Sequence, residues 1–168
     1  MRKICFPVNE ELHLRLYDEI EIYGKIFTGR DAVLPKIVRL AQEGKLAEYG
    51  IDLKGSVVFH TAVSAAGIGP TSSNKVEIEG SIPELSVAGV KIHLGKGALE
   101  PKTVDVLKQY DSFFAVTPPV SALFADRIRS IRVVAFGEEG IEAFHELEVE
   151  GIPAIIAIAN GESVFEHR

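Results

Sequence analysis

The chain of 168 residues lacks several features that would assign it to a familiar class. It has one cysteine, Cys5, which can form no internal disulfide and cannot alone hold a zinc ion or a metal cluster. Its formal net charge is −6, and it has no basic stripe of the kind that binds nucleic acid. No apolar run could span a bilayer, and none near Met1 makes a secretory signal. We therefore expect a cytoplasmic protein without nucleic-acid or membrane partners.

The composition that remains is typical of a folded domain. Hydrophobic residues make up 46% of the chain and charged residues 25%, close to the globular average, and the length favours one domain over residues 1–168. Strand and helix patterns alternate from Ser56 onward, which predicts an α/β fold with a mostly parallel central sheet layered with helices. Cys5, between Ile4 and Phe6, is expected to be a small buried residue.

Local patterns predict the individual elements. Alternation over residues 18–27, with Tyr-Gly-Lys at 23–25 as the turn, predicts an N-terminal β-hairpin. Apolar spacing predicts a helix over 32–42, with Asp31 as its N-cap and Gly44 as its stop. The other expected strands cover 56–63, 90–94, 113–116, 131–136 and 154–159, and the other expected helices cover 83–88, 102–110, 121–129 and 141–148. Asn-Gly at 160–161 predicts a tight turn into 163–165.

Arg30 is the first candidate for a functional residue. It lies in residues 27–31, between the expected hairpin and the next helix, and ligands usually bind at strand ends in α/β folds. A guanidinium can donate two parallel hydrogen bonds to one carboxylate. The alternative is an ion pair with Asp31 or another surface acid, which is common on protein surfaces.

Two further strand-end loops are rich in glycine. Residues 67–75 read Gly-Ile-Gly-Pro-Thr-Ser-Ser-Asn-Lys. The backbone N–H groups, the hydroxyls of Thr71 and Ser72 and the ammonium of Lys75 could all face an anion there. The spacing fits neither a Walker loop nor a dinucleotide fingerprint, and the alternative is a polar turn that satisfies itself. Lys96, between two glycines after a buried strand, is a third candidate, or an ordinary solvated lysine.

The histidines carry a weaker signal. His60 and His93 fall within expected apolar strands, where a histidine is more often a hydrogen-bonded packing residue than a base. His13, His145 and His167 are expected at exposed positions. No group of histidines, cysteine and aspartates has metal-ligand spacing, and no nucleophile is paired with a base. The chain is therefore predicted to hold no metal of its own.

Taken in order, the strand-end segments resemble one family. Residues 23–32, Tyr-Gly-Lys-Ile-Phe-Thr-Gly-Arg-Asp-Ala, are similar to the G-x-I-Y-T-A-R-D-A segment of the β subunits of class I fumarases and L-tartrate dehydratases. The other matching segments are Asp-Leu-Lys-Gly at 52–55, Gly-Pro-Thr-Ser-Ser at 69–73, Gly-Lys-Gly at 95–97 and Leu-Glu-Val-Glu-Gly-Ile-Pro-Ala at 147–154. The resemblance covers residues 18–166, and its order and spacing are more specific than any one loop.

This resemblance implies a three-layer β/β/α swivelling domain that works as the β subunit of an iron–sulfur hydro-lyase. In that family a separate α subunit, or an N-terminal domain, supplies three cysteines to a [4Fe–4S] cluster, whose open iron acts as a Lewis acid. The implied reaction is reversible addition of water to a short dicarboxylate such as fumarate, in an α/β hetero-oligomer. The lone Cys5 agrees with a cluster borrowed from that partner.

The resemblance also implies roles for individual residues. Arg30 and Lys96 correspond to substrate-binding residues, and Thr71 corresponds to the proposed proton-abstracting base or its relay. Lys75 stands where the family usually has arginine, and Leu34 where it usually has histidine.

The predicted site is thus catalytic Thr71 with substrate-binding Arg30, Ser72, Lys75 and Lys96. Fumarate and malate are the preferred substrates, with L-tartrate as the alternative. A non-catalytic swivelling domain that binds a partner or a small anion also stays open, because of the two departures at Leu34 and Lys75, as does a stand-alone small-molecule-binding domain.

Overall fold

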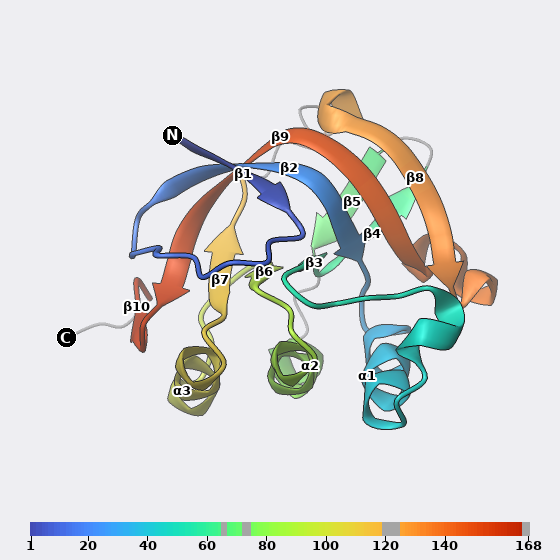
Figure 1. Cartoon of the computed structure of the whole chain (residues 1–168), viewed down its shortest axis with the longest axis horizontal. Coiled ribbons are helices and arrows are strands. Elements are labelled where there is room, and N and C mark those ends of the chain that lie inside the picture. Colours follow the sequence, from blue (N-terminus) through green and yellow to red (C-terminus); the bar gives the residue numbers. More distant parts are fainter. Residues whose placement is uncertain (65–66, 72–74, 119–124, 166–168) are drawn as a thin grey trace.

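The structure, a computed structural model, describes residues 1–64, 67–71, 75–118 and 125–165. It is a mixed α/β fold whose core is dominated by a sheet (Figure 1). The strands are β1 (Arg2–Phe6), β2 (Glu19–Thr28), β3 (Val57–Phe59), β4 (Thr61–Ser64), β5 (Gly67–Thr71), β6 (Ile92–Leu94), β7 (Phe113–Val116), β8 (Ile128–Ala135), β9 (Phe144–Ala159) and β10 (Glu162–Ser163). The helices are α1 (Leu34–Gln42), α2 (Lys75–Val87) and α3 (Pro101–Gln109), with short 3-10 turns η1 (Leu46–Tyr49) and η2 (Gly137–Glu142).

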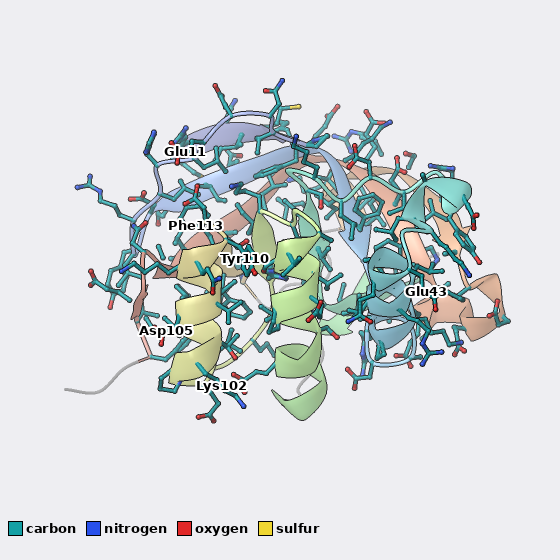
Figure 2. All side chains as sticks on the ribbon, turned by 60° about the horizontal axis from the view of Figure 1, so that its bottom comes forward. Glu11, Glu43, Lys102, Asp105, Tyr110 and Phe113 are labelled. Carbon is teal, nitrogen blue, oxygen red and sulfur yellow. The ribbon has the colours of Figure 1, made fainter. Side chains whose placement is uncertain are left out.

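The main sheet closes on itself. β1, β2, β3, β6 and β7 pair in parallel in that order. β9 is antiparallel both to β7 and to β2, so β2, β3, β6, β7 and β9 form a closed ring. The prediction of a mixed α/β fold is confirmed, but a five-stranded barrel, rather than a clear set of parallel layers, organises it. Figures 1 and 2 both show α2 between α1 and α3 on one side of this sheet.

The N-terminal hairpin predicted over residues 18–27 is wrong, because β2 is one continuous strand. It pairs with β9 along its whole length, with a bulge after Ile22. Gly24, the predicted turn residue, instead has φ +93° within the strand, and a Cβ there would collide with the backbone of Phe6 in β1. The glycine therefore permits a close approach of two strands and does not reverse the chain.

The helix predicted over 141–148 is also wrong. The 16-residue strand β9 occupies most of that range and absorbs the strand predicted over 154–159. Leu147 and Val149 are buried while Glu148 and Glu150 are exposed, the alternation of a strand with one covered face. Of the helix predicted over 121–129, residues 125–127 are helical, but β8 starts at Ile128, and residues 121–124 lie outside the described residues.

The remaining elements follow the sequence prediction closely. Strands β3, β6 and β7 and helix α3 are confirmed, and β10 follows the predicted Asn-Gly turn. α1 begins at Leu34, with Val33 rather than Asp31 at its N-cap, and Gly44 (φ +69°) follows its end. α2 is longer than the predicted 83–88, because it starts at Lys75. None of the described helices combines the length and apolar character needed to cross a membrane.

Alternation along the strands separates the barrel interior from the helix-covered face. Val57 and Phe59 belong to the apolar cluster that fills the barrel, while Val58 packs among residues of α1. The same alternation in β1 buries its two apolar residues beside Cys5 and turns Cys5 outward. The prediction of a buried Cys5 is therefore wrong, since the thiol is exposed.

Gly55 and Gly44 form a matched pair for a stability test. Both have a positive φ, +71° and +69°. A Cβ on Gly55 would collide with the carbonyl group of Val8, whereas a Cβ on Gly44 would meet nothing within 4 Å. We expect Gly44→Ala to cost about 1 kcal/mol for the left-handed backbone, and Gly55→Ala to cost about 2 kcal/mol more for the collision. Urea unfolding measures both variants, and equal losses would contradict the packing of Val8 on Gly55.

Candidate functional site

Four parallel strands end at one edge of the barrel. In the sheet register, Thr28 of β2 lies opposite Phe59 of β3, Phe59 lies opposite Leu94 of β6, and Leu94 lies opposite Ala115 of β7. Carboxyl ends of parallel strands are where α/β folds place their ligands. The segments that follow these strands therefore emerge side by side.

Backbone hydrogen bonds extend this alignment one residue beyond the strands. The residue after each strand donates its N–H to the neighbouring strand: Gly29 to the carbonyl of Phe59 (3.1 Å), His60 to that of Leu94 (2.9 Å) and Gly95 to that of Ala115 (3.1 Å). Arg30 directly follows Gly29, and Lys96 directly follows Gly95. Because only β3 lies between them and neighbouring strands are about 4.8 Å apart, the backbones of Gly29 and Gly95 are separated by roughly 10 Å.

Thr71 reaches the same edge through the β4–β5 hairpin. β4 starts at Thr61, the residue after His60, and Thr61 pairs with Thr71. The backbone of Thr71 is therefore held beside Thr61, close to the end of β3. Ser72, predicted to bind substrate, lies outside the described residues.

Lys75 is the first residue of α2, a helix whose second turn contacts the start of α3. Glu79 accepts hydrogen bonds from the backbone N–H of Glu100 and from the hydroxyl of Thr103 (2.9 Å), at the start of α3. This contact also places a carboxylate at the positive end of the α3 dipole. The first half of α2 is thereby tied to the connection between β6 and α3, in which Lys96 is exposed.

Three buried side-chain atoms at this edge lack a hydrogen-bond partner among the described residues. They are Thr28 Oγ1, Arg30 Nε and His60 Nδ1. Thr28 and His60 are completely buried. An unpaired buried polar group costs about 1–3 kcal/mol, and folded proteins keep few of them. Thr28 and His60 lie at the ends of two neighbouring strands, the first on the barrel face with Ile26 and the second on the helix-covered face with Val58. The sequence analysis did not single out either residue for a ligand site.

The surroundings of Arg30 leave its guanidinium only loosely paired. Its side chain is 29% exposed, and its Nε lies 3.9 Å from Oε1 of Glu142, at the end of η2. That distance is too long for a hydrogen bond, and a partly exposed ion pair contributes little. Leu34 is buried in an apolar cluster and packs against Gly29.

His60 and His93 form a buried hydrogen-bonded pair, as predicted for histidines in apolar strands. His60 Nε2 lies 3.3 Å from His93 Nδ1, and Ser86 Oγ of α2 lies 2.9 Å from His93 Nε2. Burial lowers the pKa of His60 to about 4. Burial, and then the neighbouring His60, lower the pKa of His93 well below its ordinary value. Both rings are therefore neutral near pH 7.

The other histidines divide differently from the prediction. His145 was expected to be exposed but is buried in β9, with Nδ1 2.9 Å from the carbonyl oxygen of Ala143. Burial lowers the pKa of His145, against a smaller opposing effect of that hydrogen bond. His13 is exposed as expected, and His167 lies outside the described residues.

Acidification is expected to destabilise the fold through His60 and His93. Their folded-state pKa values lie below the unfolded value of about 6.5, so the unfolded chain binds more protons between about pH 6.5 and 4. Stability is complete above this window and falls as the pH decreases through it. Each histidine contributes a slope of up to about 1.4 kcal/mol per pH unit. Urea unfolding should therefore give a free energy of unfolding about 4 kcal/mol lower at about pH 5 than at about pH 7.5, about 2 kcal/mol from each histidine. The same loss in a His60→Asn, His93→Gln variant would refute this origin, and the exposed His13→Gln is the control.

Comparison with known proteins assigns the chain to a family. Residues 8–168 match the family model described as fumarase C-terminus. The chain belongs to this family. A relative from Geobacillus stearothermophilus, named putative fumarate hydratase class I, is 28% identical over 95% of the chain and 32% of the relative. The anaerobic class I fumarate hydratase of Escherichia coli K12 is 26% identical over 91% of the chain and 28% of the relative.

A shorter relative matches over most of its length. The putative L(+)-tartrate dehydratase subunit beta of Methanocaldococcus jannaschii is 28% identical over 91% of this chain and 84% of the relative. The chain thus spans about a third of the class I fumarate hydratases that it matches. A fumarase C-terminal domain of this size is therefore homologous both to part of the longer enzymes and to nearly all of the β subunit.

The described residues of this fumarase C-terminal domain do not fit an iron–sulfur cluster. Such clusters need several thiolates, and this chain has only Cys5, which lies on β1. Within the described ranges, no group of three histidine, cysteine, aspartate or glutamate side chains could hold a metal ion. A cavity of about 550 Å³ lies elsewhere, beside His13 and Asp111.

Proposed function

We propose that this chain is the β subunit of a hydro-lyase that reversibly adds water to a short dicarboxylate, with fumarate and malate as its substrates. It would do so as a β/β/α swivelling domain that faces an α subunit. The observation that carries the proposal is the convergence of Arg30, Thr71 and Lys96 on one edge of the barrel. Each comes from a different segment: Arg30 and Lys96 follow β2 and β6, whose ends are in register with the end of β3, and Thr71 pairs with Thr61.

The chemistry of a dicarboxylate suits this arrangement. A dianion needs a positive group at each end, and Arg30 and Lys96 lie on opposite sides of the β3 end. Arginine can bind one carboxylate through two hydrogen bonds, while lysine supplies a compact charge. Removal of the proton next to a carboxylate builds negative charge on that group, which nearby cations stabilise. Thr71 is a poor base alone, so it needs such cations or a carboxylate of the partner.

The partner is proposed to supply the iron–sulfur cluster. The name of the M. jannaschii relative, subunit beta, supports a separate α subunit, and the greater length of the fumarate hydratases supports a site shared with a further domain. The cluster would provide Lewis-acid chemistry when bound. The residues of this chain would bind and orient the substrate and move its proton.

Reconstitution tests the proposal. The chain alone is expected to be colourless and inactive. Anaerobic co-expression with a three-cysteine α subunit is expected to give a brown complex that hydrates fumarate. Failure to form a complex, or a brown chain in the absence of the α subunit, would contradict the division of roles.

Two other functions have specific support. The M. jannaschii relative favours L-tartrate as an alternative substrate. Leu34 and Lys75, where the family usually has histidine and arginine, favour a non-catalytic domain that binds a partner or small anion. A panel of fumarate, mesaconate and tartrate separates the three, because a brown complex without turnover on any of them would favour the non-catalytic function.

A further inference from the structure

Ser86, His93 and His60 form a chain of polar side chains from α2 to the end of β3. Ser86 Oγ lies 2.9 Å from His93 Nε2, and His93 Nδ1 lies 3.3 Å from His60 Nε2. Ser86 is buried and both imidazoles are completely buried. This row of hydrogen-bonded side chains ends at His60 Nδ1, which has no hydrogen-bond partner within the described part of the protein. A polar atom buried in this way needs a ligand or another explanation.

His60 Nδ1 belongs to the residue that follows β3, at the barrel edge where β2, β3, β6 and β7 end. Val58 packs with residues of α1 and is paired with His93, and His60 follows it by two residues. Side chains alternate along a strand, so both imidazoles lie on the same face of the sheet as Val58, the face that packs against the helices. Because Nδ1 is bonded to Cγ, it stays close to the backbone of its own residue. The next residue is Thr61, whose strand partner is Thr71.

The proton count allows only two arrangements. Each neutral imidazole carries one N–H, and one of the two protons must lie between the rings. If His93 Nδ1–H donates to His60 Nε2, then His60 carries its proton on Nδ1, and the Ser86 hydroxyl donates to His93 Nε2. If the direction is reversed, His60 Nδ1 is an open acceptor. The neighbouring cations Arg30 and Lys96 favour a negatively charged ligand, for which the open donor is the matching group.

We propose that His60 Nδ1–H donates a hydrogen bond to a carboxylate at this edge, with His93 and Ser86 as positioning residues that hold its tautomer, an assignment that rests on the function proposed above. The donor is neutral and fixed, so it adds a directed contact without a third positive charge. Burial contributes to this role because it keeps the ring from being protonated.

Imidazole tautomers can be measured without a ligand. Long-range ¹⁵N–¹H NMR of the whole chain is expected to show the proton of His60 on Nδ1. Ser86→Ala removes the hydroxyl that donates to His93 Nε2, and it should therefore lower the fraction of His60 that carries its proton on Nδ1. Ser81→Ala replaces another buried serine of α2 and should leave it unchanged. A proton found on His60 Nε2 would overturn the assignment.

Kinetics of the α/β complex test the contact itself. Ser86→Ala is expected to raise the KM for fumarate about tenfold, the scale of one hydrogen bond to a charged group, with kcat changed less than about twofold. His60→Asn, whose amide nitrogen can replace Nδ1, should retain more affinity than His60→Leu. A complex that hydrates fumarate with the same KM in the Ser86 and Ser81 variants would refute the role of His60 and leave the proposed function intact. A complex without turnover would refute the proposed function, and the NMR tautomer would then decide whether His60 offers a donor.

Discussion

Replacement of Arg30 by alanine in the α/β complex is expected to lower kcat/KM for fumarate about 10³-fold, or about 4 kcal/mol. The guanidinium follows an anchored strand end, its Nε is buried without a hydrogen-bond partner in the described structure, and its contact with Glu142 is long. A carboxylate can therefore bind without competing against a strong internal partner. Most of the loss should appear in KM, because the contact with the carboxylate exists before the chemical step.

Two further variants make this prediction specific. Arg30→Lys keeps the charge but loses the bidentate geometry, so it should recover only part of the affinity. Arg39→Ala removes another arginine nine residues later, on an exposed position of α1, and should leave the kinetics unchanged. If Arg30→Ala and Arg39→Ala behaved alike, Arg30 would have no part in binding the substrate.

Replacement of Thr71 by alanine is expected to lower kcat about 10²-fold or more, the usual effect of losing acid–base assistance. Its backbone pairs with Thr61, the second residue after β3, which lies between the strands that lead to Arg30 and Lys96. KM should change little, because the two cations still bind the carboxylates.

Thr71→Ser is the matched control for this prediction. It keeps a hydroxyl at the same position and should retain most of the turnover, whereas Thr71→Ala should not. Unchanged kcat in Thr71→Ala, in a complex of normal colour and assembly, would remove Thr71 from the mechanism.

The sequence predicted the buried parallel strands well and the long antiparallel strand poorly. β3, β6 and β7 are short apolar runs bounded by glycine or polar residues, and such runs identify buried strands. The second half of β9 was predicted as the strand over 154–159, but its first half was predicted as a helix, although Glu146, Glu148 and Glu150 alternate with apolar residues. In the sequence Gly24 is indistinguishable from a turn glycine, since only the approach of Phe6 in β1 shows why a glycine is needed within β2.

For the site, sequence reasoning identified the loops but not all of their contacts. Arg30, Thr71 and Lys96 were predicted from motifs at strand ends, and the register explains how residues so far apart in sequence emerge together. The open nitrogen of His60 could not be predicted, because it depends on the tertiary contact of His93 with Ser86. In the sequence, the position of His60 near the end of an apolar strand is the one feature that could have indicated a ligand-binding role.

A crystal structure of the α/β complex with malate bound is the most direct test of the account. It should place one carboxylate of malate within hydrogen-bond distance of the Arg30 guanidinium and the other within reach of the Lys96 ammonium, with Thr71 beside the carbon chain. Malate bound away from the ends of β2, β3 and β6, with Arg30 and Lys96 both facing solvent, would contradict it.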